Sequence, residues 1–303
     1  MPTKVPAAQS DADRFDAANE PVAYTLLTQT TAQVLGGIMT LNIALIGYGA
    51  IASRVASGIR DMTEVELVGA LVRTPGTAAT DGVSELNLND ALERADLFVE
   101  CAGVPAVTEY GPNIIAANKL LLLASVGALA DPILRRTLLD GGPGRVYVTN
   151  GAIGGLDILA SAALEGGLDS IVLETRKAPA SLIQPWMDAD LAERLRGGGS
   201  NLESLVLYEG GVSEAIEKFP ANLNVSVALA HATNMWDHTI VKLIADPTAN
   251  LTKHTIHASG RTGTYQFEIT NNPLPDSPST SGVVVASVLR GIRTIAGASG
   301  VSV

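Results

Sequence analysis

Four histidines and one cysteine are the side chains that could move protons or attack a substrate near neutral pH. The histidines are His231, His238, His254 and His257. Imidazole titrates close to neutrality, so any of them could serve as a general acid or base. His254 and His257 are three residues apart and would point to opposite sides of a strand. We therefore expect no histidine-based metal site, and spacing alone favours no histidine over the others.

A glycine-rich turn provides the second kind of chemistry. Residues 47–52 read Gly-Tyr-Gly-Ala-Ile-Ala, directly after the apolar run at 41–46 and at the start of a helical pattern. In this G-x-G-x-x-A motif the first glycine permits a tight turn, and the second lets a pyrophosphate approach the backbone. The helix N-terminus then offers N–H groups to the phosphates. We predict dinucleotide binding, with contacts from Gly47, Gly49, Ala50 and Ile51.

The end of the next strand bears on the choice of cofactor. An NAD site usually has Asp or Glu about 20 residues after the glycines, where it binds the ribose hydroxyls. Here the strand ends in Leu-Val-Arg-Thr at 71–74, without an acid. Arg73 could pair with the 2′-phosphate of NADP, so NADP is expected, alone or alongside NAD. The alternative is that Arg73 is a solvated surface residue.

Composition excludes several classes of protein. The 303 residues carry a net charge of −11 without a basic stretch, which argues against a nucleic-acid partner. One cysteine allows no intrachain disulfide. Residues 21–53 lack charge but contain polar residues and glycines, so we expect no membrane span there. The acidic start, at 1–20, does not resemble a secretory signal, and a cytoplasmic location is expected.

Alternating strands and helices predict an α/β fold. Apolar runs at 41–46, 65–72, 97–101, 120–124 and 146–148 are typical of buried parallel strands, with helices at 50–60, 105–118 and 132–140. This is a Rossmann-type doubly wound parallel sheet. Cys101 and Ala102 follow the third strand, at the edge where such folds bind ligands, so we place them near the cofactor. A small buried apolar role is the alternative for Cys101.

The rest of the chain predicts a smaller α+β domain. We expect helices at 151–167, 213–218, 224–231 and 283–295, and strands at 171–175, 239–245, 255–259 and 264–270. Residues 179–202 are expected to be irregular, and 271–281 a Pro/Ser-rich loop. The expected organisation is a poorly ordered extension at 1–38, a dinucleotide-binding domain at 39–150, a catalytic and dimerisation domain at 151–281, and a terminal helix at 282–303 that returns to the first domain.

Several blocks together resemble one enzyme family. They are 47–52, Val-Glu-Cys-Ala-Gly at 99–103, Ser-Val-Gly-Ala-Leu at 125–129, Gly-Ala-Ile-Gly-Gly-Leu-Asp at 151–157, Arg-Lys at 176–177, Phe-Pro-Ala-Asn-Leu-Asn-Val at 219–225, Ala-Asp-Pro at 245–247 and Pro-Ser-Thr-Ser at 278–281. From about residue 41 to about 295, the chain is similar to the L-aspartate dehydrogenases. The family's last motif usually reads Asn-Pro-Lys-Thr-Ser, whereas 277–281 here read Ser-Pro-Ser-Thr-Ser.

The resemblance implies NAD(P)-dependent interconversion of L-aspartate with oxaloacetate plus ammonia, through iminosuccinate, by a homodimer. It places the catalytic histidine on His254, six residues before Gly260, and cofactor contacts on Ala128 and Asn224. A dicarboxylate substrate needs local positive charge in this acidic chain. Lys177 and Arg176 are the first candidates, with Lys253 and Arg261 behind them. The hydroxyls of Thr280 and Ser281, before the last helix, could assist.

Two other functions remain open at this stage. One is another two-domain dehydrogenase or reductase, such as a homoserine dehydrogenase or a dihydrodipicolinate reductase. The latter usually contains adjacent histidines with a lysine, which this sequence lacks. The other is a regulatory protein that binds NAD(P) without turnover. An ammonium-dependent oxidation of NAD(P)H by oxaloacetate would separate these possibilities from the leading one.

Overall fold

A computed structural model describes residues 40–164, 166–197, 203–220 and 223–297. The predicted extension at 1–38, Asn222 and the chain beyond 297 lie outside the described residues. Residues 40–303 form one unit by their contacts. In the described part of it, the strands form two five-stranded sheets and one short two-stranded ribbon.

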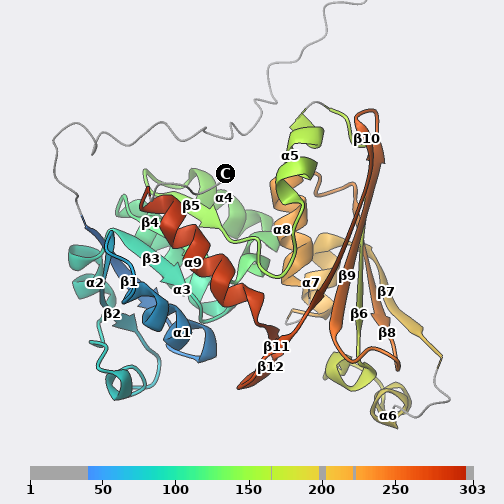
Figure 1. The fold of residues 1–303 in the computed structure, drawn as a ribbon, viewed down its shortest axis with the longest axis horizontal. Helices are drawn as coiled ribbons and strands as arrows, with labels where there is room; N and C mark the ends of the chain where they lie inside the picture. The colour runs from blue at the N-terminus through green and yellow to red at the C-terminus, as the bar shows by residue number, and fades with distance from the viewer. Residues whose placement is uncertain (1–39, 165, 198–202, 221–222, 298–303) are drawn as a thin grey trace, which may run out of the picture. The chain divides into compact units, whose positions relative to one another are not determined.

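The first sheet is parallel, as predicted, with strand order β2-β1-β3-β4-β5. Its strands are β1 (Leu41–Ile46), β2 (Val65–Leu71), β3 (Leu97–Glu100), β4 (Leu120–Leu123) and β5 (Arg145–Val148). The helices of this half are α1 (Ala50–Ile59), α2 (Leu88–Arg94), α3 (Val104–Ala116) and α4 (Pro132–Asp140). Residues 43–46 and 97–100 are almost fully buried, because helices cover both faces of the sheet (Figure 1).

The second sheet is mixed, with strand order β10-β9-β6-β8-β7. Its strands are β6 (Ser170–Lys177), β7 (Leu205–Gly211), β8 (Thr239–Ala245), β9 (Thr252–Gly260) and β10 (Gly263–Asn271). Helices α5 (Leu156–Leu164), α7 (Val212–Lys218) and α8 (Asn224–Thr233) lie on one side of this sheet (Figure 1). Along β6, Ile171, Leu173 and Thr175 are fully buried on that side, while the alternating residues are more exposed.

The chain passes between the two sheets at two places. It leaves the first sheet through residues 149–155 and returns through 272–282, which include the ribbon β11 (Pro273–Leu274) and β12 (Ser277–Ser281). The last helix, α9 (Val283–Ile295), then packs on α1 and β4. Helices α1 and α9 approach each other closely at Gly58, where a Cβ would lie 2.7 Å from Leu289 Cδ1.

Two expectations for the elements were wrong, and two elements were not predicted. Residues 179–202 contain a helix, α6 (Ala189–Gly197), and 271–281 form the ribbon rather than a loop. Strand β7 and helix α2 were not predicted. In α6, Asp188 accepts a hydrogen bond from Leu191 N and the helix buries Ala192 and Leu195, a helical spacing that the flanking prolines and glycines obscured. No helix in the described ranges is both long and apolar enough to span a bilayer.

Candidate active site

The glycine turn after β1 has the geometry that a dinucleotide phosphate requires. Gly47 has φ +83°, and a Cβ there would lie 2.6 Å from the Cβ of Ala102, so only glycine fits. Beside Gly49, a Cβ would meet no described atom within 4 Å. Gly49 precedes α1 without a side-chain cap, so the first N–H groups of α1 are available to an anion. These residues fit the pyrophosphate of NAD or NADP.

Glu100 organises the edge of the site, and the sequence analysis did not single it out. It ends β3, is fully buried, and accepts four hydrogen bonds at the carboxyl edge of the first sheet. Its Oε1 accepts from Ala102 N and Gly103 N at 2.7 Å and from Ser125 Oγ at 2.9 Å, and its Oε2 accepts from Ser125 N at 2.9 Å. Glu100 thus holds together the two loops that follow β3 and β4.

Burial raises the pKa of Glu100, and the four hydrogen bonds act in the opposite direction. All four donors are an N–H or O–H group, so the arrangement suits the ionised carboxylate. The sequence did carry a signal for this role, because Glu100 is the one charged residue in the strand Leu-Phe-Val-Glu. A charged residue is rarely buried unless it is hydrogen-bonded or paired.

A cavity of about 320 Å³ lies between the carboxyl edge of the first sheet and the second sheet. Seven residues predicted from the sequence line it: Ile51, Cys101, Lys177, Asn224, His254, Thr280 and Ser281. Ser125, which binds Glu100, also lines it. The cavity therefore brings together predicted residues from α1, the loop after β3, β6, α8, β9 and β12, most of them far apart in the sequence.

The other predicted residues lie outside the lining of this cavity. Gly47, Gly49 and Ala50 form the phosphate turn, and Ala102 packs against Gly47. Ala128 lies buried in the 3-10 turn η3 (Val126–Ala130), and Arg73 is exposed just after β2.

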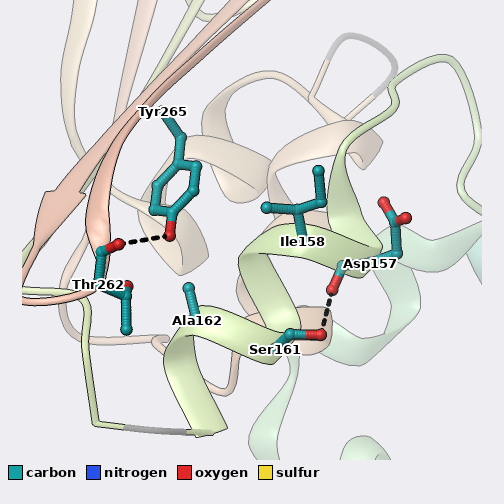
Figure 2. Close-up of a pocket in the computed structure, with 6 residues that line it drawn as sticks. All are labelled: Asp157, Ile158, Ser161, Ala162, Thr262 and Tyr265. Atoms are coloured by element: carbon teal, nitrogen blue, oxygen red, sulfur yellow. Dashed lines mark hydrogen bonds between the residues drawn. The ribbon is translucent and has the colours of Figure 1, made fainter.

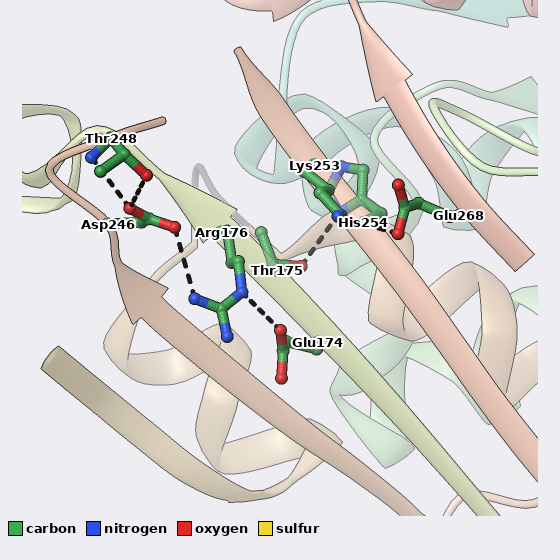
Figure 3. Close-up of polar contacts among 8 residues, drawn as sticks. All are labelled: Glu174, Thr175, Arg176, Asp246, Thr248, Lys253, His254 and Glu268. Atoms are coloured by element: carbon green, nitrogen blue, oxygen red, sulfur yellow. Dashed lines mark hydrogen bonds and ion pairs between the residues drawn. The ribbon is translucent and has the colours of Figure 1, made fainter. Parts of the chain in front are cut away.

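His254 is directly opposite Thr175 in the pairing of β9 with β6. Its Nδ1 lies 2.9 Å from Thr175 Oγ1, and both residues are buried (Figure 3). Burial lowers the pKa of His254 to about 4, and the positive charge of Lys177 acts in the same direction. Because this pKa is far below 7, the ring is uncharged at neutral pH. Since Nδ1 is bonded to Thr175, Nε2 is the ring nitrogen left for a molecule in the cavity.

Arg176 and Lys177 are adjacent in β6, where successive side chains point to opposite faces of the sheet. Lys177 lines the cavity, on the same side of the strand as Thr175, and burial lowers its pKa. Arg176 points to the opposite side and pairs with Glu174 and Asp246 at 2.6 and 3.3 Å (Figure 3). Lys253 pairs with Glu268 at 2.8 Å. Lys177 is thus the cation, among the described residues, that the fold brings to His254.

Asn224 begins α8 and joins the two halves of the cavity. Its Oδ1 accepts a hydrogen bond of 3.2 Å from Gly127 N, in η3. A Cβ on Gly127 would fall on this oxygen, so glycine is needed for the approach. Cys101 faces the cavity from the other sheet. Burial and the neighbouring Glu100 raise the pKa of its thiol, which is protonated and unsuited to nucleophilic attack.

The three remaining histidines do not line the cavity. His238 and His257 are exposed, and His257 lies on the side of β9 away from His254. His231 contacts the ring of Trp236 edge-on, and burial lowers its pKa. In the described ranges, no three residues of the types His, Cys, Asp and Glu form a group that could bind a metal ion.

A second hollow lies between α5 and the hairpin of β9 and β10 (Figure 2). It has a volume of about 450 Å³ and is open to solvent. The hydroxyl of Ser161 donates to Asp157 O, and that of Tyr265 donates to Thr262 O, at 2.8 and 3.2 Å. Its lining includes no cation or histidine. We favour the cavity between the two sheets as the active site, because His254 and Lys177 line it and it adjoins the phosphate turn.

Known proteins match the chain over most of its length. The L-aspartate dehydrogenase of Serratia proteamaculans is 36% identical over 262 residues, which cover 84% of this chain and 96% of that protein. A second relative, from Ruegeria pomeroyi, carries the same name and is 35% identical, covering 84% and 92% of the two chains. The chain belongs to the L-aspartate dehydrogenase family. It is an NAD(P)-dependent oxidoreductase.

Two family models divide the chain in agreement with the two sheets. Residues 157–295 match the C-terminal domain of aspartate dehydrogenases, and residues 47–142 match the NAD-binding domain described for homoserine dehydrogenase. The crystal structure of the aspartate dehydrogenase from Thermotoga maritima superposes with a TM-score of 0.66 at 25% identity, covering 87% of this chain and 99% of that one. The L-aspartate dehydrogenase family thus accounts for both halves, and the homoserine dehydrogenase likeness in the family models is confined to the dinucleotide-binding half.

Proposed function

We propose that this member of the L-aspartate dehydrogenase family interconverts L-aspartate with oxaloacetate plus ammonia, through iminosuccinate, at the cavity between the sheets. The observation that carries the proposal is the position of His254 and Lys177. Both line the cavity, which Cys101, Ala124 and Ser125 border from the carboxyl edge of the dinucleotide-binding sheet. Ligands of open α/β sheets bind at this edge.

Within this proposal, the side chains divide the work of binding. Lys177 attracts a carboxylate of the substrate, because a cation in a partly desolvated site interacts strongly with an anion. The hydroxyls of Thr280 and Ser281 donate to the same substrate from β12. Asn224 and the Gly47 turn would hold the cofactor, the turn at its pyrophosphate. A bound NAD or NADP supplies or accepts the hydride at C2 of the substrate.

His254 acts on the oxygen at C2 of oxaloacetate. This oxygen leaves as water when ammonia adds and the imine forms, and a positioned N–H group assists by binding it. The walls of the cavity limit access of bulk water to the imine, which water would otherwise return to oxaloacetate. Overall, oxaloacetate, ammonium, NAD(P)H and one proton give aspartate, NAD(P)⁺ and water.

The test is the oxidation of NAD(P)H by oxaloacetate with and without ammonium. We expect a rate that depends on ammonium, and a loss of about 10²-fold or more in His254→Ala, the range of general acid–base contributions. His257→Ala is the matched control, because His257 is exposed on the same strand, and it should keep the full rate. Absence of an ammonium-dependent rate would overturn the proposed reaction. A full rate in His254→Ala would overturn only the histidine assignment.

We also propose that the enzyme is a cytoplasmic homodimer that pairs through the face of the second sheet opposite α5, α7 and α8 (Figure 1). This face exposes Val206 and Ile240, which are 52% and 37% accessible. Light scattering of the purified protein should give twice the chain mass. Val206→Glu and Ile240→Glu together should shift it toward the monomer, and a monomeric wild type would reject the pairing.

A further inference from the structure

We propose that Thr175 is a positioning residue that fixes the ring of His254 with its proton on Nε2, so that the ring presents an N–H donor to the cavity. This inference deepens the proposed function, since it specifies what His254 offers to the substrate. It concerns a residue that contributes no atom to the lining of the cavity.

The argument begins with the burial of the Thr175 hydroxyl. Thr175 is fully buried in β6, directly opposite His254 in β9. Across the described ranges, the hydrogen bond found for this hydroxyl is the one to His254 Nδ1, at 2.9 Å. A threonine hydroxyl carries one hydrogen, and leaving a buried donor without an acceptor is unfavourable. The hydroxyl therefore donates to Nδ1.

The protonation of the ring follows from this direction. A neutral imidazole has one nitrogen that donates and one that accepts. Nδ1 accepts from Thr175, so the hydrogen of the neutral ring is on Nε2. Burial and the charge of Lys177 keep the ring neutral, as shown by the pKa of His254 near 4. A carboxylate in place of Thr175 would instead accept from Nδ1–H and favour the charged ring.

The protonated Nε2 of His254 determines which groups of a substrate can bind next to the ring. An Nε2–H donor attracts the C2 oxygen of a 2-oxo acid and opposes ammonium, whose hydrogens also donate. A neutral imidazole that polarises a carbonyl is an established catalytic device. Thr175 thus makes His254 a recognition group for the oxo acid, and ammonia must approach C2 from another side.

The direct test measures the tautomer in the full chain without substrate. Protein labelled with ¹⁵N-histidine gives long-range ¹H–¹⁵N correlations in which protonated and unprotonated ring nitrogens are well separated. His254→Gln and His257→Gln identify the signals. We expect His254 as the neutral Nε2–H form at pH 7. A neutral Nδ1–H form, or a charged ring, would overturn the proposal. This readout needs no turnover, so it is independent of the proposed reaction.

Two variants test the kinetic consequence. Thr175→Val has nearly the same shape but no hydroxyl, and Thr175→Ser keeps the hydroxyl. We expect Thr175→Val to lower kcat with oxaloacetate about tenfold, the effect of losing roughly one positioning hydrogen bond, while the Kd of NAD(P)H is unchanged. Thr175→Ser should restore kcat. A full kcat in Thr175→Val would overturn the proposal if His254→Ala lowers the rate.

Other results remain interpretable. If Thr175→Val does not fold, the tautomer of His254 in the wild type and the kcat of Thr175→Ser test the proposal instead. If His254→Ala keeps the full rate while the wild-type ring is the Nε2–H form, the catalytic assignment of His254 fails and the positioning by Thr175 stands.

Discussion

His254 shows how burial selects one histidine among four. It is 3% accessible, lies beside Lys177, and has a pKa of about 4, whereas His238 and His257 are exposed. At pH 7 the ring is mostly neutral in the unfolded chain as well, so folding requires almost no loss of a proton. As the solution becomes acidic, the unfolded chain takes up a proton near pH 6.5 that the folded chain does not accept until about pH 4.

This difference predicts an acid lability that can be traced to one residue. Because the folded pKa is depressed, His254 lowers the free energy of unfolding as the pH falls from about 6.5 toward 4, by about 2 kcal/mol at pH 5. The fall in Tm between pH 7 and pH 5 should be smaller in His254→Gln than in the wild type or in His257→Gln. An equal fall in all three proteins would contradict the burial argument.

The position of Arg73 gives a prediction about cofactor choice. It is exposed after β2, next to the fold's ribose-binding position, without an acid nearby in sequence. We expect Arg73→Ala to raise the Kd of NADPH about tenfold and to leave that of NADH unchanged, since only NADPH carries the 2′-phosphate. Cofactor fluorescence on binding measures both constants. Arg60→Ala, a change at another exposed arginine, is the control. Equal effects on the two cofactors would remove Arg73 from the site.

At the scale of elements, one carboxylate connects the ends of two strands. Glu100 accepts hydrogen bonds from the loop after β3 and the loop after β4, through Ala102, Gly103 and Ser125. The loop after β3 also contacts Gly47, and the loop after β4 leads into η3, which binds Asn224. The cofactor turn and the cavity are therefore positioned by the same buried group.

Glu100→Gln should reveal this connection. Glutamine keeps the shape but places an NH₂ group against one of the four donors, and we expect a loss of about 1–3 kcal/mol in the free energy of unfolding. The KM for the cofactor should rise more than the KM for oxaloacetate. Ser125→Ala removes one hydrogen bond only, so it should be milder on both measures. If Glu100→Gln leaves the stability and the KM for the cofactor unchanged, Glu100 does not position the loops after β3 and β4.

The elements differ in how far the sequence predicted them. The parallel sheet was predicted because its strands are short apolar runs separated by helical patterns. β7 and α6 were missed, since β7 mixes exposed and half-buried residues and α6 lies between proline- and glycine-rich segments. The family resemblance pointed to His254 and Asn224, which line the cavity, but not to the residues that orient them. The contacts with Thr175 and Gly127 join residues 79 and 97 positions apart, and such pairings depend on the register between elements.

At the scale of the whole molecule, the matched regions lie within residues 47–295. We therefore expect a chain that lacks residues 1–38 to keep kcat, KM and Tm close to those of the full chain. The two proteins should be compared in the ammonium-dependent assay and by thermal unfolding. A truncated chain that fails to fold or to turn over would show that the extension belongs to the enzyme.

The two crossings between the sheets have a further consequence. Residues 151–152 on the way out, and 273 and 280–281 on the way back, all line the cavity. Any rotation of one sheet against the other must bend these segments, which would act as hinges. The hinges thus form part of the wall of the site, so a ligand that fills the cavity also restrains the motion. Binding should then couple the melting of the two halves, and both should unfold in one ligand-dependent transition.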